Sequence, residues 1–258
     1  MRLWIMSDLH LELTKGWDLP ASDARPQFDV MIIAGDLVPR MERGVAWLRQ
    51  RVADKPVIYV AGNHEFYGCD IDRTVDKARQ LATGTNVHVL QNDTVTIDGV
   101  LFVGSTLWTD FNLFGNAELA MSRAADGMND YRRIRKRRYA ERLRPIDTFR
   151  RHLESRDFIA RVTRDGHSKP TVVVSHHGSV KEAISAGAEN DILSAAYASD
   201  CHELLEPVDL WIYGQTHEQR DFIIDRTRLV TNAKGYGPWR PDERWENPSF
   251  DPNWVIEI

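Results

Sequence analysis

The chain of 258 residues has 42% hydrophobic and 28% charged residues, the composition of a folded globular protein rather than a disordered one. Its formal net charge of −5 gives no overall attraction to nucleic acid or to anionic membranes, and it has no apolar run of about 18 residues that could span a bilayer. Two cysteines, Cys69 and Cys201, are too few for a disulfide framework. We expect a soluble, cytoplasmic protein with no membrane contact, and its oligomeric state is left open.

Short apolar runs alternate with helical patterns along much of the chain. Strands are expected at Leu3–Met6, Val30–Ala34, Val57–Ala61, Val87–Leu90, Val100–Val103, Thr171–Val174, Leu210–Tyr213, Phe222–Ile224, Leu229–Val230 and Trp254–Ile258. Helices are expected at Arg43–Ala53 and Asp72–Ala82. Strand and helix in alternation are typical of an α/β protein. Because Asp98-Gly99 is a hairpin signal, the sheets should be mixed, with antiparallel parts.

The segment from Phe111 to Lys169 is densely charged and carries no strand pattern. Asn116 can cap a helix that stops at Gly127, and Pro145 suits the first turn of a second helix that ends near Gly166. We interpret residues 111–169 as a helical insertion over one edge of the sheets, within a single domain that covers residues 1–258.

Polar motifs stand at the ends of several predicted strands. In chain order they are Asp8-Leu9-His10, Gly35-Asp36, Gly62-Asn63-His64-Glu65, His176-His177 and Gly214-Gln215-Thr216-His217. Asp8 and His10 are two residues apart, so in extended chain their side chains share one face. Carboxylate, imidazole and amide oxygen together suit Mn²⁺, Fe²⁺ or Zn²⁺. Each motif alone could be a turn or a helix cap, but all of them in order favour a site for two metal ions.

At these motifs the chain resembles the calcineurin-like metallophosphoesterases, whose pattern runs Asp-x-His, Gly-Asp, Gly-Asn-His-Asp/Glu, His and Gly-His-x-His. The resemblance covers nearly the full length and looks closest to small bacterial members described as Ser/Thr phosphatase-like. It implies a four-layer αββα sandwich of two mixed β-sheets with flanking helices. It also implies hydrolysis of a phosphoester by a hydroxide that bridges two divalent metal ions.

The resemblance assigns roles by position. The first ion would be held by Asp8, His10 and His217, both ions would be bridged by Asp36, and the second would be held by Asn63, His176 and Gln215. His64 would assist the leaving group, and Glu65 would orient His64.

Gln215 departs from the family pattern, which has His at this position. A neutral amide is a weaker donor to transition metals than imidazole, and the second site becomes rich in oxygen. We therefore expect Mn or Fe/Zn in the first site and Mn or Mg, bound more weakly, in the second.

A small phosphoester, either a phosphodiester or a small phosphomonoester, is the expected substrate. The residues expected to contact it are His177, Asn129, Tyr67 and Lys234. Two alternatives remain open. One is a non-catalytic metal-binding scaffold, which only Gln215 favours. The other is a nuclease, which would use the basic run Arg132, Arg133, Arg135, Lys136, Arg137, Arg138, Arg142 and Arg144. Binding of nucleic acid is possible on this pattern but not favoured, because nearby acidic residues can neutralise the run.

Overall fold

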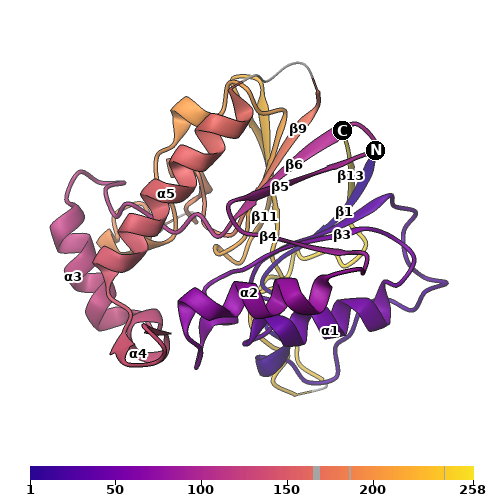
Figure 1. Cartoon of the computed structure of the whole chain (residues 1–258), viewed down its shortest axis with the longest axis horizontal. Coiled ribbons are helices and arrows are strands. Elements are labelled where there is room, and N and C mark those ends of the chain that lie inside the picture. Colours follow the sequence, from indigo (N-terminus) through magenta and orange to yellow (C-terminus); the bar gives the residue numbers. More distant parts are fainter. Residues whose placement is uncertain (165–168, 186, 241) are drawn as a thin grey trace.

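Two large β-sheets pack face to face, and helices cover their outer faces (Figure 1). The computed structural model describes residues 1–164, 169–185, 187–240 and 242–258. The first sheet has the strand order β13-β1-β2-β3-β4, and the second has the order β11-β12-β10-β9-β6-β5. The first consists of β1 (Arg2–Met6), β2 (Val30–Ala34), β3 (Val57–Val60), β4 (Val87–Leu90) and β13 (Val255–Glu257). The second consists of β5 (Asp93–Ile97), β6 (Val100–Ser105), β9 (Thr171–Ser175), β10 (Leu210–Ile212), β11 (Gln219–Ile224) and β12 (Thr227–Asn232).

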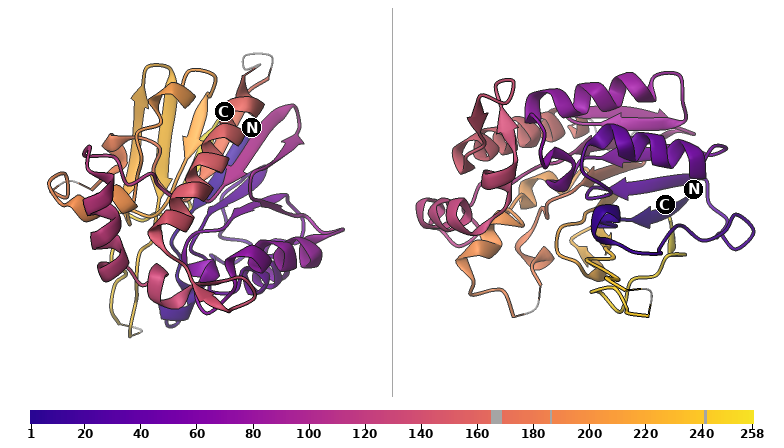
Figure 2. Two further views of the ribbon diagram at one scale, coloured as in Figure 1. Left: turned by 60° about the vertical axis from the view of Figure 1, so that its left-hand side comes forward. Right: turned by 90° about the horizontal axis from the view of Figure 1, so that it is seen from below.

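Helices occupy the outer layers and the segment between β6 and β9. The α-helices are α1 (Met41–Arg51), α2 (Ile71–Ala82), α3 (Ala117–Gly127), α4 (Asp130–Arg133) and α5 (Pro145–Thr163). Short 3₁₀ helices are η1 (Leu11–Leu13), η2 (His64–Phe66), η3 (Lys181–Ala183), η4 (Ile192–Ala196) and η5 (His202–Leu204). Both further views show the two sheets side by side, with α5 on the side of the second sheet and α1 and α2 on the first (Figure 2).

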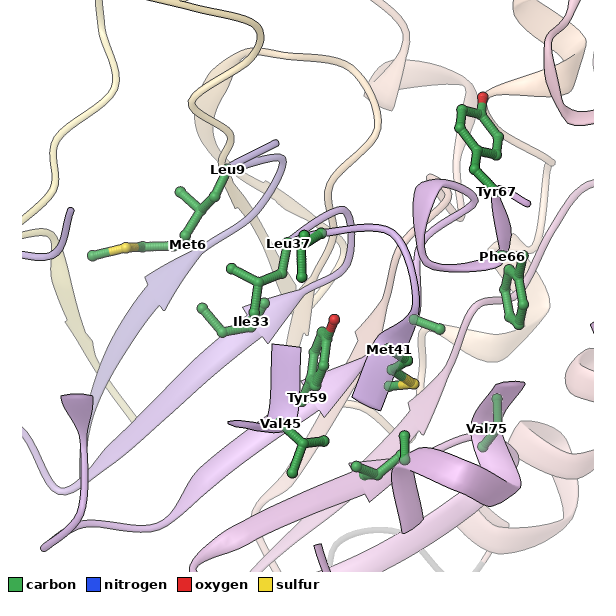
Figure 3. Packing of buried hydrophobic residues seen from close by; sticks show 14 of the residues in the cluster. Met6, Leu9, Ile33, Leu37, Met41, Val45, Tyr59, Phe66, Tyr67 and Val75 are labelled. Atoms are coloured by element: carbon green, nitrogen blue, oxygen red, sulfur yellow. The ribbon is translucent and has the colours of Figure 1, made fainter. Parts of the chain in front are cut away.

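The period of two along each strand explains the layers. Leu3 and Ile5 belong to the buried cluster between the sheets, whereas Trp4 belongs to the cluster beneath α1 and α2. On this helix-facing side, Met41 and Val45 of α1 lie near Tyr59 of β3 (Figure 3). Strands buried on both faces read as continuous apolar runs, as the sequence predicted. The expected αββα sandwich of two mixed sheets is confirmed.

Most of the predicted elements are confirmed, including the hairpin at Asp98-Gly99 that joins β5 to β6. Asn116 caps α3 and accepts a hydrogen bond from the backbone N of Leu119 at 3.1 Å. The expectation of no strand between residues 111 and 169 is wrong, because β7 (Arg135–Lys136) and β8 (Glu141–Arg142) form a small hairpin there. Their two-residue strands are too short for a hydrophobic period, and contacts such as Arg135 N to Cys69 O at 2.9 Å hold them. The predicted helix end near Gly166 lies outside the described residues.

Within the described ranges, every helix is too short or too polar to cross a lipid bilayer.

Candidate metal centre

The polar motifs meet where parallel strands of both sheets end. β1, β2 and β3 are mutually parallel neighbours, and β9 and β10 are parallel in the second sheet. Within each sheet, backbone bonds join neighbouring strand ends: Asp8 N donates to Gly35 O at 3.0 Å, and Gly214 N donates to His176 O at 2.9 Å. Between the sheets, the backbone N of Gln215 donates to Oδ2 of Asp8 at 3.1 Å. The ligands that the sequence placed at separate strand ends therefore share one edge. We call them the rim: Asp8, His10, Asp36, Asn63, His176, Gln215 and His217.

Glycines allow the rim to close. A Cβ on Gly214 would lie 2.7 Å from Oδ2 of Asp8, and a Cβ on Gly62 would lie 2.6 Å from the backbone N of Asp36. Gly35 has φ +89°, and its Cβ would lie 2.7 Å from the backbone N of Gly62. Any larger residue at these positions would push the ligand loops apart.

Several rim residues have left-handed backbone. The φ angles are 52° at Asp8, 44° at His10, 54° at Asp36, 71° at Gln215 and 52° at His217. Such a conformation costs a non-glycine residue of order 1 kcal/mol and persists only where the surroundings enforce it. The shared strain indicates that the loops are held for function rather than for local stability.

One group of ligand atoms comes from Asp8, His10 and His217. The two Nε2 atoms of His10 and His217 are 3.2 Å apart, and His217 Nε2 is 3.5 Å from Asp8 Oδ1. His10 Nε2 also lies 3.8 Å from Oδ2 of Asp36. These atoms converge as ligands around one cation do, and this set matches the expected first site.

A second group shares Asp36. His176 Nε2 is 3.5 Å from Asp36 Oδ1 and 3.1 Å from Asn63 Oδ1. Asp36 thus faces His10 with one oxygen and His176 with the other, so its carboxylate is shared by the two groups of ligand atoms. Asp36 Oδ1 also accepts a hydrogen bond from the backbone N of His64 at 2.8 Å.

Hydrogen-bond partners outside the rim orient the imidazoles of His176 and His217. His176 Nδ1 lies 2.9 Å from the carbonyl of Ala34, and His217 Nδ1 lies 2.7 Å from Oε2 of Glu246. With Nδ1 occupied as donor, the lone pair of each imidazole is on Nε2, which points into the site. Glu246 was missed from the sequence because it lies in the loop before β13, with no motif around it.

Gln215 completes the second group. Its backbone N donates to Oδ2 of Asp8 at 3.1 Å, which fixes the loop, while its side-chain Oε1 is buried without a hydrogen-bond partner. A buried polar atom without a partner is costly, and a hard cation would satisfy it. The donor set therefore fits divalent metal ions, and Gln215 Oε1 is a further oxygen available to one of them.

The pKa values of two buried histidines also indicate that this site favours positive charge. Burial lowers the pKa of His176, but the carboxylate of Asp36 outweighs burial and raises that pKa to about 10. Burial likewise opposes a proton on His217, and the bonds to Asp8 and Glu246 raise its pKa to about 10. Clustered carboxylates in a buried place attract either protons or metal cations.

The carboxylate that contacts the imidazole of His64 belongs to Glu12 and not to Glu65. His64 Nδ1 lies 2.8 Å from Oε1 of Glu12, on η1. Burial disfavours the charge of Glu12, but its bonds to His10 and His64 outweigh burial and lower the pKa of its carboxyl to about 2. Glu12 follows His10 by two residues, but His10 has left-handed backbone and Glu12 lies on η1, so the spacing of extended chain gave no signal for this contact.

The predicted role of Glu65 is wrong. Its carboxylate is fully buried and accepts hydrogen bonds from backbone N atoms of Asp36, Leu37 and Gly62, and from the hydroxyl of Tyr59. It fastens the loop after β2 to the loop after β3. It therefore positions Asp36 and has no contact with the imidazole of His64.

A cavity of about 370 Å³ opens over the rim. Asp36, Asn63, His64 and Gln215 lie in its lining, as do two residues predicted to meet substrate, Tyr67 and Asn129. Asp130, beside Asn129, also lines the cavity. It is buried and accepts hydrogen bonds from Asn63 Nδ2 at 2.8 Å and from the Tyr67 hydroxyl at 2.7 Å, so it orients the amide of Asn63.

Two predicted substrate contacts are wrong. Lys234 is fully buried and donates to Thr14 Oγ1 and to the carbonyls of Gly235 and Gly237, so its ammonium is used by the fold. His177 is 1% exposed and its Nδ1 lies 3.1 Å from the carbonyl of Thr106. Neither residue lines the cavity. Each follows a motif in sequence but turns into the core, where local pattern gives no information.

The basic run does not line the cavity either. Lys136 pairs with Asp147 at 2.7 Å and with Glu141 at 3.4 Å, and Arg137 pairs with Glu141 at 2.7 Å. The Arg133 guanidinium lies over the ring of Tyr67 at 4.7 Å. Lys136 and Arg137 are therefore paired with carboxylates of the insertion.

A family model described as calcineurin-like phosphoesterase matches residues 1–219. The chain belongs to this family. The family and the buried Asp/His cluster together fit a metal-dependent phosphoesterase that hydrolyses phosphate esters.

Individual relatives are distant. Uncharacterized protein L509 of Acanthamoeba polyphaga mimivirus is 25% identical over 284 residues, which cover 98% of this chain and 95% of that protein. Phosphopantetheinyl hydrolase (PptH) from Mycobacterium tuberculosis is 22% identical, with a TM-score of 0.65, over 91% of this chain and 89% of the other. A dimetal phosphatase from Danio rerio is 12% identical, with a TM-score of 0.50, over 89% and 86%. These two structures share the fold.

Proposed function

We propose that this protein hydrolyses small phosphoesters, phosphodiesters foremost, with two divalent metal ions held by the rim. The observation that carries the proposal is the convergence of three ligand groups, Asp8–His10–His217, Asp8–Asp36–His176 and His10–Asp36–His64, each with its ligand atoms within 4.8 Å of one another. Two bound ions would make a nucleophile from water at neutral pH and neutralise charge on the phosphoryl oxygens.

His64 is suited to the role of general acid. Its Nδ1 lies against Glu12, so Nε2 is left for the cavity, 3.9 Å from Oδ2 of Asp36. In the reaction, a water oxygen bonds to phosphorus and the bond from phosphorus to the leaving oxygen breaks. His64 gives a proton to that oxygen, and the proton lost by water restores His64 or passes to solvent. Burial opposes a proton on His64, but Asp36 and Glu12 raise its pKa, which favours the acid form.

The metals follow from the donors. The first site, with two imidazoles and Asp8, suits Mn, Fe or Zn, whereas the second site has His176 as its one nitrogen donor among oxygens and suits Mn or Mg more weakly.

The test is hydrolysis of bis-p-nitrophenyl phosphate and p-nitrophenyl phosphate by metal-stripped protein refilled with Mn²⁺. We expect cleavage of the diester that depends on added metal. His64→Ala should lose most of the rate and keep its metal. A wild-type protein that binds Mn²⁺ yet cleaves neither ester would favour the scaffold alternative. A rate on nucleic acid that falls steeply with salt would favour the nuclease.

A phosphopantetheinyl ester is a second candidate substrate. The M. tuberculosis neighbour is named for this group. The group is an uncharged chain with amides beyond its phosphate, and the cavity offers the neutral polar side chains of Asn129 and Thr216 beside Met128 and Leu193. Release of 4′-phosphopantetheine from a phosphopantetheinyl-serine peptide would support it. No release by protein that cleaves bis-p-nitrophenyl phosphate would contradict it.

A further inference from the structure

The cavity has an unusual balance of charge for a site that receives an anion. Among the described residues that line it, the carboxylates are Asp36, Asp130 and Glu246, and the imidazoles are His64 and His217. No lysine or arginine of the described chain is in the lining. Positive charge for the substrate would therefore come from the bound metal ions and from His64 and His217, since the other described lining residues supply none.

Beside these charged groups, the cavity is lined by uncharged side chains. We call this part the wall: Met128, Asn129, Ile184, Leu193, Tyr197 and Thr216. It is assembled from the end of α3, the residues after η3, η4 with the residue that follows it, and the loop after β10. Met128 and Ile184 present apolar surface, whereas Asn129 and Thr216 present a neutral amide and a hydroxyl. Such a surface solvates an uncharged group and gives no compensation to a second anion.

Basic residues around the wall are engaged elsewhere. The Arg133 guanidinium lies over the ring of Tyr67 at 4.7 Å, and the Lys181 ammonium lies over the ring of Phe114 at 5.7 Å. Arg220 donates to the backbone carbonyl of Ile184 at 3.1 Å. None of these three basic residues lines the cavity, whereas the exposed residue Glu246 does.

We propose that the wall selects phosphodiesters whose ester group beyond the phosphate is uncharged and of mixed apolar and amide or hydroxyl character, and that it rejects substrates with a second negative charge. This inference rests on the proposed phosphodiesterase function. It excludes nucleoside polyphosphates and nucleic acid strands as good substrates, because each places further anions against a cavity lined by Asp130 and Glu246.

The test compares two diesters of nearly equal size with the same leaving group. Propyl p-nitrophenyl phosphate carries one negative charge, and 2-carboxyethyl p-nitrophenyl phosphate carries two. With Mn²⁺-loaded protein at low salt, we expect kcat/KM to be roughly tenfold or more higher for the propyl ester, because like charges at short range repel. The ratio should shrink as salt rises and the Debye length falls from about 10 Å at 0.1 M to about 3 Å at 1 M.

Leu193→Lys places a cation on the wall and should bring the ratio of kcat/KM for the propyl and carboxyethyl esters toward one. Ile223→Lys is the matched control, because it adds the same charge to an exposed position on β11, outside the cavity lining, and should leave the ratio unchanged. If Leu193→Lys does not fold, Ala188→Lys places the charge in the same cavity, and the salt dependence of the wild-type protein needs no variant.

Equal kcat/KM for the two diesters, or a ratio that Leu193→Lys leaves unchanged, would overturn the proposal while the phosphodiesterase function stands. Hydrolysis of neither diester by protein that has bound Mn²⁺ would overturn both. A high ratio that salt and Leu193→Lys both reduce would support the selection by charge.

Discussion

The rim and the wall of one cavity are built in opposite ways. Each rim residue follows a buried strand within five residues, and bonds such as Asp8 N to Gly35 O fix neighbouring loops to each other. The wall comes from the end of α3 and from short 3₁₀ segments between β9 and β10, and it includes half-exposed side chains such as Leu193 and Tyr197. Rigid strand ends suit chemistry that tolerates little displacement, and loops suit a surface that sets substrate preference.

The difference predicts different kinetic effects. Rim variants should lose metal or kcat, because their atoms face the reacting group. Wall variants should change KM or the choice of substrate at nearly constant kcat, since they contact a part of the substrate that does not react.

The largest effect should come from Asp36→Asn, at the centre of the rim. Asp36 faces both His10 and His176, and an amide supplies one neutral oxygen where the carboxylate supplies two charged ones. We expect a fall in kcat/KM of about a thousandfold, which corresponds to losing several kcal/mol of transition-state stabilisation. Metal content by mass spectrometry should fall in parallel. Full metal content with normal kcat would refute the bridging role.

A smaller loss should follow Glu12→Gln, because Glu12 touches His64 and not the substrate. We expect kcat to fall about 10- to 100-fold, the range for partners that orient a functional imidazole. The loss should be larger for phenyl esters than for p-nitrophenyl esters, since a poorer leaving group depends more on a donated proton. Glu118→Gln, the same change on an exposed position of α3, is the control. Equal losses for both leaving groups would contradict a role through His64.

Gln215→His should reduce the difference in affinity between the two metal sites. An imidazole is a stronger donor than the amide whose Oε1 is now buried without a partner. We expect the second Mn²⁺ to bind about tenfold more tightly, with the first unchanged, in calorimetric titration of metal-stripped protein. Two equally tight sites in the wild-type protein would show that Gln215 does not weaken metal binding at the second site.

Met128→Ala tests the wall. Met128 is 8% exposed and lines the cavity. Loss of its contact with the substrate should raise KM by roughly three- to tenfold, since each buried methylene is worth about 0.8 kcal/mol, and kcat should stay within about twofold. Steady-state kinetics on the propyl diester measures both constants. A fall in kcat with unchanged KM would contradict this prediction and indicate that Met128 acts at the reacting group.

The smallest effect at neutral pH should come from Lys234, whose charge is buried within the fold. Burial lowers the pKa of its ammonium to about 8, from 10.5 in the unfolded chain. Between these values the unfolded chain binds more protons than the folded one, so the free energy of unfolding should rise from pH 8 to pH 9.5. Urea unfolding of the metal-free protein should show this rise, and Lys234→Met should lack it. A rise of the same size in the variant would contradict the assignment.

The sequence by itself determined the strands and the rim. Buried parallel strands read as apolar runs, and the polar residues after them can only lie at the sheet edge, so Asp8, Asp36, Asn63 and His217 were predictable. The glycines that precede ligands could also be recognised in the sequence. The close approach of Gly214 to Asp8 explains why a residue without a side chain is needed there.

Only the tertiary structure decided which side chains serve those ligands. Glu12, Asp130 and Glu246 reach the site from separate loops, and their hydrogen bonds depend on distances that no local period encodes. Glu65 stands next to His64 in the chain, yet η2 turns its carboxylate toward the backbone of the loop after β2. Lys234 and the wall follow the same rule: a loop side chain faces either substrate or core according to packing from distant segments, and sequence neighbours do not fix that choice.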